Sequence, residues 1–256
     1  MTVRLLVAAF YLLQHPRAER PDVRAGLDTL YGGGFPAAAA YFAELAGRDS
    51  TDPAPATFEA SAYIWWAAAL ENDAYEAPRI DSLLDLAIAR ARATSPGPAH
   101  DFWLATALGY RARQRDLHGH SWGAAKDAKA MRDAYARVLA ADSSCTDCYL
   151  GLGVYQYGLA RASALARLVA KIVGLGSGNA ERGIAYMRRA AREGDLARVE
   201  AAWVLAAALE REAARDPAQR AALEQDARDE VARLAARYPG NPVFRRFLRD
   251  VPDPSP

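Results

Sequence analysis

The sequence contains little lysine and no excess of charge of either sign. Lysine occurs only at positions 126, 129 and 171, and 32 basic residues are balanced by 31 acidic ones. Proteins that bind nucleic acid normally carry a basic excess on one face, so this balance argues against a nucleic-acid partner. We attribute the predominance of Arg over Lys to an arginine- and alanine-rich composition.

Patterns typical of β-strands are also missing. No segment alternates apolar and polar residues with β-branched enrichment, so no sheet is expected. Apolar residues make up 52% of the chain but aromatic residues only 9%. Much of the apolar share is alanine, which is the best helix former and lets helices approach closely. A chain of 256 residues is long for one compact core; an all-α repeat array, in which each repeat packs on its neighbours, resolves this.

Cysteine is scarce, and both cysteines belong to one motif, Cys145-x2-Cys148. A redox pair would need a thioredoxin-like βαβ setting, which is absent. A zinc site would need two more ligands, and His118-x-His120 lies at the far end of a predicted helix, on the order of 30 Å away. Three readings remain: two unlinked thiols, which are favoured; a local disulfide, if the chain is exported; or a metal site completed by a partner chain. We expect no metal and no cofactor.

Hydrophobic runs long enough to span a membrane are absent. The nine apolar residues from Leu5 to Leu13, after Arg4, are too short for a bilayer. They fit the hydrophobic region of a signal peptide, although Pro16 is unfavourable for cleavage after Ala18. Residues 1–20 are therefore interpreted as an export signal, with a first packed helix as the alternative. The expected location is exported or periplasmic, and the alternative is cytoplasmic.

Helical segments alternate with Gly-, Pro- and Asp-rich breakers over residues 21–250, before a flexible proline-rich tail at 251–256. We predict about eleven helices whose short connections make neighbours antiparallel. Asn179 and Asp216 have the positions of helix N-caps. The predicted helices are 22–31, 35–48, 56–72, one from 78 to just before Pro96, 102–115, 122–141, 147–173, 180–192, 196–214, one from Asp216 to Arg237, and 242–249.

A spacing of four, three and five residues recurs in four of the predicted helices. Small residues fit where helices cross closely, large ones fill the space beside them, and a turn-former ends the unit. The four sets are Ala38, Phe42, Leu45 and Ser50; Leu84, Ile88, Ala91 and Pro96; Met131, Tyr135, Val138 and Ser143; and Ala227, Val231, Leu234 and Pro239.

This spacing, followed by Tyr149, Leu152 and Gly153 in first-helix positions, resembles the tetratricopeptide repeat. The stretches LYGGGFPAAAAYF, AYIWWAAALEND, CYLGLGVYQYG and KIVGLGSGNAERGIAYMRRAA are similar to a subgroup of bacterial tetratricopeptide proteins, usually exported. They are distantly similar to a eukaryotic tetratricopeptide family linked to inclusion-body clearance. The resemblance covers about residues 22–249. It implies a right-handed α-solenoid of about five antiparallel helix hairpins that acts as a scaffold or adaptor, and it names no catalytic residues.

Aromatic residues in first helices are the candidates for a binding surface. In such arrays the first helices line a concave groove, where exposed rings can bind a peptide. We expect Trp103, Tyr110 and Tyr157 to face this groove, with His100 at its rim. The predicted function is a non-catalytic scaffold that binds a peptide or partner helix of another protein. A carbohydrate-active helical toroid is an alternative, which would need a deep pocket with convergent carboxylates.

The stretch Leu159–Leu175 lengthens one repeat well beyond the usual size. It combines apolar residues such as Leu168 and Ile172 with Arg167 and Lys171. The favoured interpretation is an extended helix that buries this apolar face against its neighbour. The alternative is a docking surface for a partner helix or a membrane, as in a membrane-associated assembly factor. The glycines at 174–178 predict a turn, because they match no phosphate-binding motif.

Overall fold

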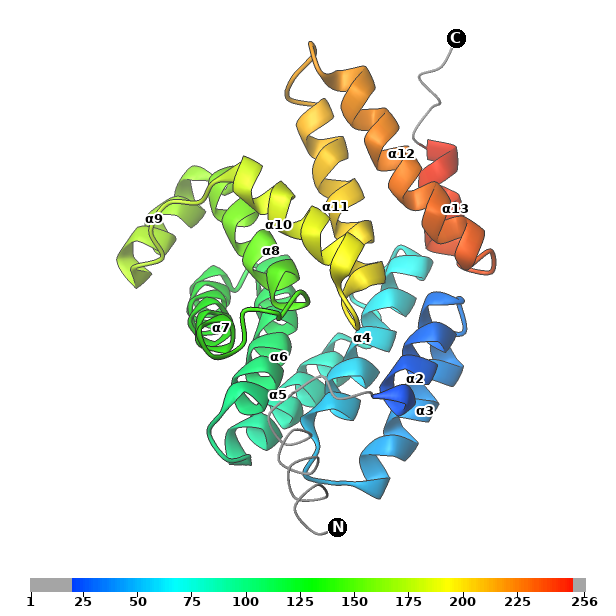
Figure 1. Ribbon diagram of the computed structural model, residues 1–256, viewed down its shortest axis with the longest axis vertical. Coiled ribbons are helices and arrows are strands. Elements are labelled where there is room, and N and C mark those ends of the chain that lie inside the picture. The colour runs from blue at the N-terminus through cyan, green and yellow to red at the C-terminus, as the bar shows by residue number, and fades with distance from the viewer. Residues whose placement is uncertain (1–19, 251–256) are drawn as a thin grey trace, which may run out of the picture.

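The computed structural model describes residues 20–250 (Figure 1). The interpretation of residues 1–19 as an export signal or first helix, and of 251–256 as a tail, concerns residues outside this range. Within it the chain is all-α and has no strand, as predicted; it has twelve helices, where about eleven were expected. The helices are α2 (Pro21–Tyr31), α3 (Phe35–Arg48), α4 (Pro53–Leu70), α5 (Ala77–Ala93), α6 (Pro98–Leu117), α7 (Ser121–Ala141), α8 (Cys148–Arg161), α9 (Ala164–Val173), α10 (Ala180–Glu193), α11 (Arg198–Ala213), α12 (Arg220–Arg237) and α13 (Pro242–Asp250).

Prolines that the sequence presents as breakers begin several helices. Pro53 opens α4 and Pro98 opens α6, each about one turn before the predicted start. Proline suits the first helical position because its fixed φ is helical and its missing N–H would be unpaired there. Asn179 caps α10 as predicted, and its side chain accepts from the Arg182 N–H at 2.7 Å. Asp216 does not cap α12: its carboxylate accepts from the Ala218 N–H at 3.0 Å, inside the turn before the helix.

The single helix predicted over 147–173 is in fact two helices, α8 and α9. The backbone at Ala162 is extended, with ψ of 147°. The Ser163 hydroxyl then accepts from the Ala166 N–H at 3.2 Å and caps a new helix. Consequently α8 packs against α10, while α9 packs against α7.

The recurring four-three-five spacing marks a buried face. Its members on α3, α5, α7 and α12 face the core. Those that are buried are Ala38, Phe42, Leu84, Ile88, Ala91, Met131, Tyr135, Val138, Ala227, Val231 and Leu234. The sequence repeat therefore corresponds to equivalent packing positions on four helices.

Two glycines set the close crossing of α8 and α10. A Cβ atom on Gly153 would lie 2.9 Å from the carbonyl oxygen of Gly183, and one on Gly183 would lie 2.7 Å from the backbone nitrogen of Tyr157. Both distances are too short for any other residue. The contact therefore fixes which helix pairs with α8 across the intervening α9.

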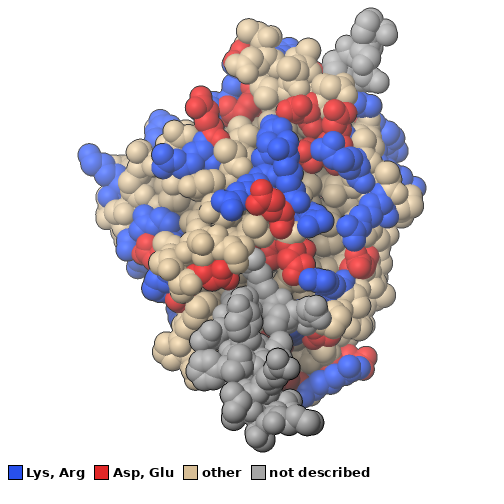
Figure 2. Space-filling view, viewed as in Figure 1, with Lys and Arg blue, Asp and Glu red and all other residues tan. Residues whose placement is uncertain are grey.

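The helices follow one another around the molecule, and α13 returns to the N-terminal half of the chain (Figure 1). Trp65 on α4 contacts three rings from other helices, with centroids 5.6 Å from Tyr31, 5.8 Å from Trp203 and 5.6 Å from Phe244. The first and last parts of the chain thus share one aromatic cluster. Basic and acidic side chains are interspersed over the face shown in Figure 2.

Hydrogen bonds reinforce the contact between the two ends. The buried Asn241 side chain donates to the Tyr31 carbonyl at 2.9 Å and accepts from the Val243 N–H at 2.9 Å. Arg246 donates to the Ala68 carbonyl at 2.6 Å. That carbonyl is in the last turn of α4, where a cation also complements the helix dipole.

Cys145 and Cys148 form a disulfide in the structure, with Cα atoms 5.4 Å apart. The favoured interpretation as two unlinked thiols therefore does not describe the structure. The turn after α7 brings the two Cα atoms into the usual range for a disulfide, and both residues are buried. The bond joins this turn to the first residue of α8. None of the described helices combines the length and apolarity needed to cross a membrane.

Replacing Asn241 with Ala should destabilise the fold by about 2–4 kcal/mol, because it removes a helix cap and leaves the Tyr31 carbonyl buried without its donor. Urea denaturation would measure the change in free energy of unfolding. Asn179→Ala is the matched control, since Asn179 also caps a helix but makes no contact between the chain ends; about 1 kcal/mol is expected for it. Equal losses in the two variants would show that the end-to-end contact contributes little.

Reduction of the disulfide should lower the free energy of unfolding by about 2 kcal/mol, the amount that chain entropy predicts for so short a loop. Denaturation with and without dithiothreitol would measure this. A Cys145→Ala, Cys148→Ala variant should not respond to the reductant. A wild-type protein that reacts with iodoacetamide after unfolding, without any prior reduction, would contradict the disulfide.

Candidate functional site

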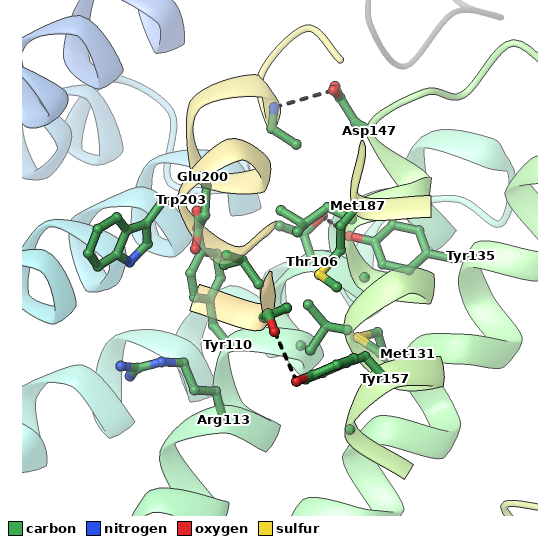
Figure 3. A pocket seen from close by; sticks show the side chains of 18 of the residues that line it. Thr106, Tyr110, Arg113, Met131, Tyr135, Asp147, Tyr157, Met187, Glu200 and Trp203 are labelled. Carbon is green, nitrogen blue, oxygen red and sulfur yellow. Dashed lines mark hydrogen bonds between the residues drawn. The ribbon is translucent and has the colours of Figure 1, made fainter. Parts of the chain in front are cut away.

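A cavity of about 560 Å³ lies between α4, α6, α7, α8, α10 and α11. Most of its wall is apolar, and Figure 3 shows the thioether groups of Met131 and Met187 among aromatic rings. The aromatic residues in the wall are Phe58, Phe102, Tyr110, Tyr135, Tyr157 and Trp203. Rings and thioethers present large polarisable surfaces, so this wall suits apolar or cationic groups.

Glu200 is the acidic group in the middle of this wall. It lies in the first turn of α11, and the Tyr110 hydroxyl of α6 donates a hydrogen bond to its carboxylate (Figure 3). Burial raises the pKa of Glu200, while the Tyr110 hydrogen bond and the positive charge of Arg113 act in the opposite direction. Burial, with the neighbouring Glu200 charge, also raises the pKa of Tyr110. Among residues 20–250, no Lys or Arg side chain forms an ion pair with Glu200.

Tyr157 is fixed by hydrogen bonds at another part of the wall. Its hydroxyl lies 3.2 Å from the Ala208 carbonyl and 2.9 Å from Glu212 on α11, so it donates to either oxygen. Arg161 also donates to Glu212, at 2.7 Å through Nε, which lowers the pKa of that carboxyl. Burial raises the pKa of Tyr157 to about 12. The ring is therefore held neutral and in one orientation.

A second carboxylate in the wall, Asp147, has a structural role. Its oxygens accept from the backbone N–H groups of Asp195, Leu196 and Ala197, at 2.6, 3.2 and 3.3 Å. These donors belong to the segment that leads into α11, so Asp147 fixes the position of the helix that carries Glu200. With three donors bound and only 2% of its surface exposed, Asp147 has little capacity left for a ligand.

The structure separates the four residues that the sequence suggested for the groove. Tyr110 and Tyr157 line the cavity. Trp103 belongs to the core: it is 7% exposed, and its ring packs edge-on against Phe58 and Phe102. His100 is not part of the cavity wall; it lies in the first turn of α6, with Nδ1 3.2 Å from the Thr94 hydroxyl.

Sequence reasoning missed Glu200, Trp203 and Arg113, all of which line the cavity. Glu200 stands in an ordinary amphipathic stretch, where an acidic residue in the first turn is commonly attributed to the helix dipole. No local pattern distinguishes it from the exposed Glu210 on the same helix. What distinguishes Glu200 is its hydrogen bond with Tyr110, which is 90 residues away in the sequence.

The described part of the chain contains no cluster of potential metal ligands. Over residues 20–250, no group of three or more His, Cys, Asp or Glu side chains is arranged to hold a metal ion. The disulfide also occupies both thiols of the Cys-x2-Cys motif. Comparisons of this chain with protein-family models, with curated proteins and with solved structures found no match.

Proposed function

We propose that this protein is a non-catalytic binding module of the tetratricopeptide type, which holds a short segment of a partner protein in the cavity. The observation that carries the proposal is the carboxylate of Glu200, which forms no ion pair with a Lys or Arg of residues 20–250 and lies in a cavity lined by rings and thioethers. A volume of about 560 Å³ falls in the range of roughly 300–1,000 Å³ that is typical of ligand sites.

The contact between the chain ends favours a short segment over a long helix. An open array offers a groove along which a helix can lie, whereas here the rings around Trp65 fill the space where α2, α4, α11 and α13 meet. What remains has the dimensions of a pocket, which suits one or a few inserted side chains. We therefore propose a peptide segment, or a chain end, as the occupant.

Glu200 indicates which chemical group of the bound segment lies in the cavity. Tyr110 supplies one donor, but a carboxylate can accept several hydrogen bonds. Glu200 is partly shielded from water, and pairing with a positive charge compensates a carboxylate for lost hydration. A lysine or arginine side chain, or an amino terminus, would pair with Glu200, and the surrounding rings would stabilise its positive charge. We therefore propose that the bound segment carries a basic group next to apolar residues.

The wall favours binding over glycoside hydrolysis. Glycosidases place two carboxylates on opposite sides of the scissile bond. Glu200 is one candidate, but Asp147 is saturated by backbone donors, and Asp116 is exposed. Among the described residues of the cavity wall, no convergent pair of carboxylates supports the carbohydrate-active alternative. We also propose that the protein is exported. The disulfide supports this location, because thiols are normally kept reduced in the cytosol.

Selection of random peptides displayed on phage, followed by calorimetric titration of the enriched peptides, tests this function. Enriched sequences should combine Lys or Arg with apolar residues.

Ala207→Phe should fill the cavity and reduce affinity at least tenfold, whereas Ala136→Phe on the exposed side of α7 should not. Glu200→Gln should reduce affinity on the order of tenfold or more, since hydrogen bonds to charged groups contribute about 1.5–3 kcal/mol. Glu210→Gln is its control. Peptides that bind the filled variant as tightly as the wild type would exclude the cavity as the site.

The pH dependence of stability provides a separate test of the Glu200 environment. Because the pKa of Glu200 is raised on folding, the folded chain binds a proton more tightly than the unfolded chain. This contribution to stability is therefore lost as the pH rises above ~4.3, the usual value for glutamic acid. Glu200→Gln does not titrate and keeps an acceptor for Tyr110. Urea denaturation at each pH would measure the free energy of unfolding of both proteins. The value for the variant minus that for the wild type should increase from pH 4 to neutrality. The opposite trend would show that Glu200 is stabilised as an anion.

A further inference from the structure

The most exposed large apolar side chains of the described residues lie together on α9. Ile172 is 64% exposed and Leu168 is 55% exposed. They are four residues apart, so they share one face of the helix. This corrects the interpretation of 159–175 as an extended helix that buries its apolar face.

The ends of α9 and its attachment to the body are formed by residues outside the exposed face. Ser163 caps its start, and Gly174 ends it in the left-handed conformation, with φ of 76°. The opposite side attaches the helix to the body through Ala170 and Leu175, each 4% exposed. The Leu175 carbonyl also accepts a hydrogen bond from the Tyr155 hydroxyl at 2.6 Å. The attachment and the exposed face are therefore separate features of the same short segment.

Positive charge borders the exposed face. Arg167 and Lys171 precede Leu168 and Ile172 directly, and both are exposed. Residues 161–180 contain three basic residues and no acidic one, although the whole chain is almost neutral. Lys and Arg side chains lie at the left edge of the molecule in Figure 2, where α9 projects in Figure 1.

We propose that α9 binds the surface of an anionic membrane. A helix of ten residues is about 15 Å long, so it lies in the plane of the interface rather than across the bilayer. Leu168 and Ile172 enter the apolar boundary, while Arg167 and Lys171 contact the anionic headgroups. Binding is weak and reversible, because only two large side chains insert.

The charges favour lipid over a second copy of the chain. Two α9 helices packed face to face would bring Arg167 and Lys171 near the same residues of the other copy. No acidic residue in 161–180 could offset that repulsion. A bilayer containing anionic lipid supplies both the apolar interior and the opposite charge. The proposal does not rest on the cavity, because no residue of α9 lines it.

Flotation of the full chain with lipid vesicles tests the proposal. The wild type should float with vesicles of equal parts phosphatidylglycerol and phosphatidylcholine, with on the order of tenfold stronger partitioning than into pure phosphatidylcholine. High salt should weaken this preference. Leu168→Ser with Ile172→Ser should abolish flotation, and Arg167→Gln with Lys171→Gln should remove the preference for the anionic vesicles.

Leu70→Ser with Leu86→Ser is the matched control, because these leucines are 51% and 41% exposed on other helices. This variant should float like the wild type. All three variants should keep the helical circular dichroism spectrum, since every substituted side chain is exposed. A wild type that does not float, or a Leu168→Ser, Ile172→Ser variant that floats equally well, overturns the proposal. A wild type that forms a concentration-dependent dimer in sedimentation also overturns it, if only the Leu168→Ser, Ile172→Ser variant loses that dimer. That result would identify the face as a self-association surface.

Discussion

The ring contacts of Trp65 join the first and last of the described helices, and one of these rings, Trp203, also lines the cavity. Trp65 meets Tyr31 from α2, Trp203 from α11 and Phe244 from α13. Each such aromatic pair contributes about 0.5–1.5 kcal/mol beyond the area it buries. In an extended repeat array each unit contacts only its neighbours. Here the first and last of the described helices also pack on Trp65, and Trp203 of the same cluster lines the cavity.

The same helix connects this contact to the candidate site. Trp203 and Glu200 are three residues apart on α11, so they lie on neighbouring positions of one face. Asp147 fixes the start of α11 through three backbone N–H groups, while the ring of Trp203 packs on Trp65. The position of Glu200 beside Tyr110 is thus determined by the packing of distant helices. A cavity built in this way is pre-organised, because its wall is held in place without a ligand.

The helices and the buried phase of the repeat could be predicted from the sequence, because breakers, caps and spacing are local signals. The place of Tyr110 and Tyr157 on the lining face of their helices could be predicted for the same reason. Trp103 is two turns before Tyr110 on the same helix face, but at its level Phe58 covers that face. The contact of Trp65 with Trp203 joins residues 138 positions apart, and no local pattern encodes it. The cavity and the place of Glu200 in its wall depend on such distant contacts, so they could not be predicted from the sequence.

The break after α8 shows how the chain accommodates an insertion without losing its helix pairing. A single helix over 147–173 would extend far beyond α10, its partner, which has 14 residues. Ending α8 at Arg161 gives it the same 14 residues. The contact of Gly153 with Gly183 then fixes the pairing, whatever the chain does in between. The inserted residues form α9 outside the paired helices, so its exposed face can change in sequence without affecting the core. Leu168 and Ile172 are exposed and contribute little to packing, so the need for a buried core does not account for large apolar side chains at these positions.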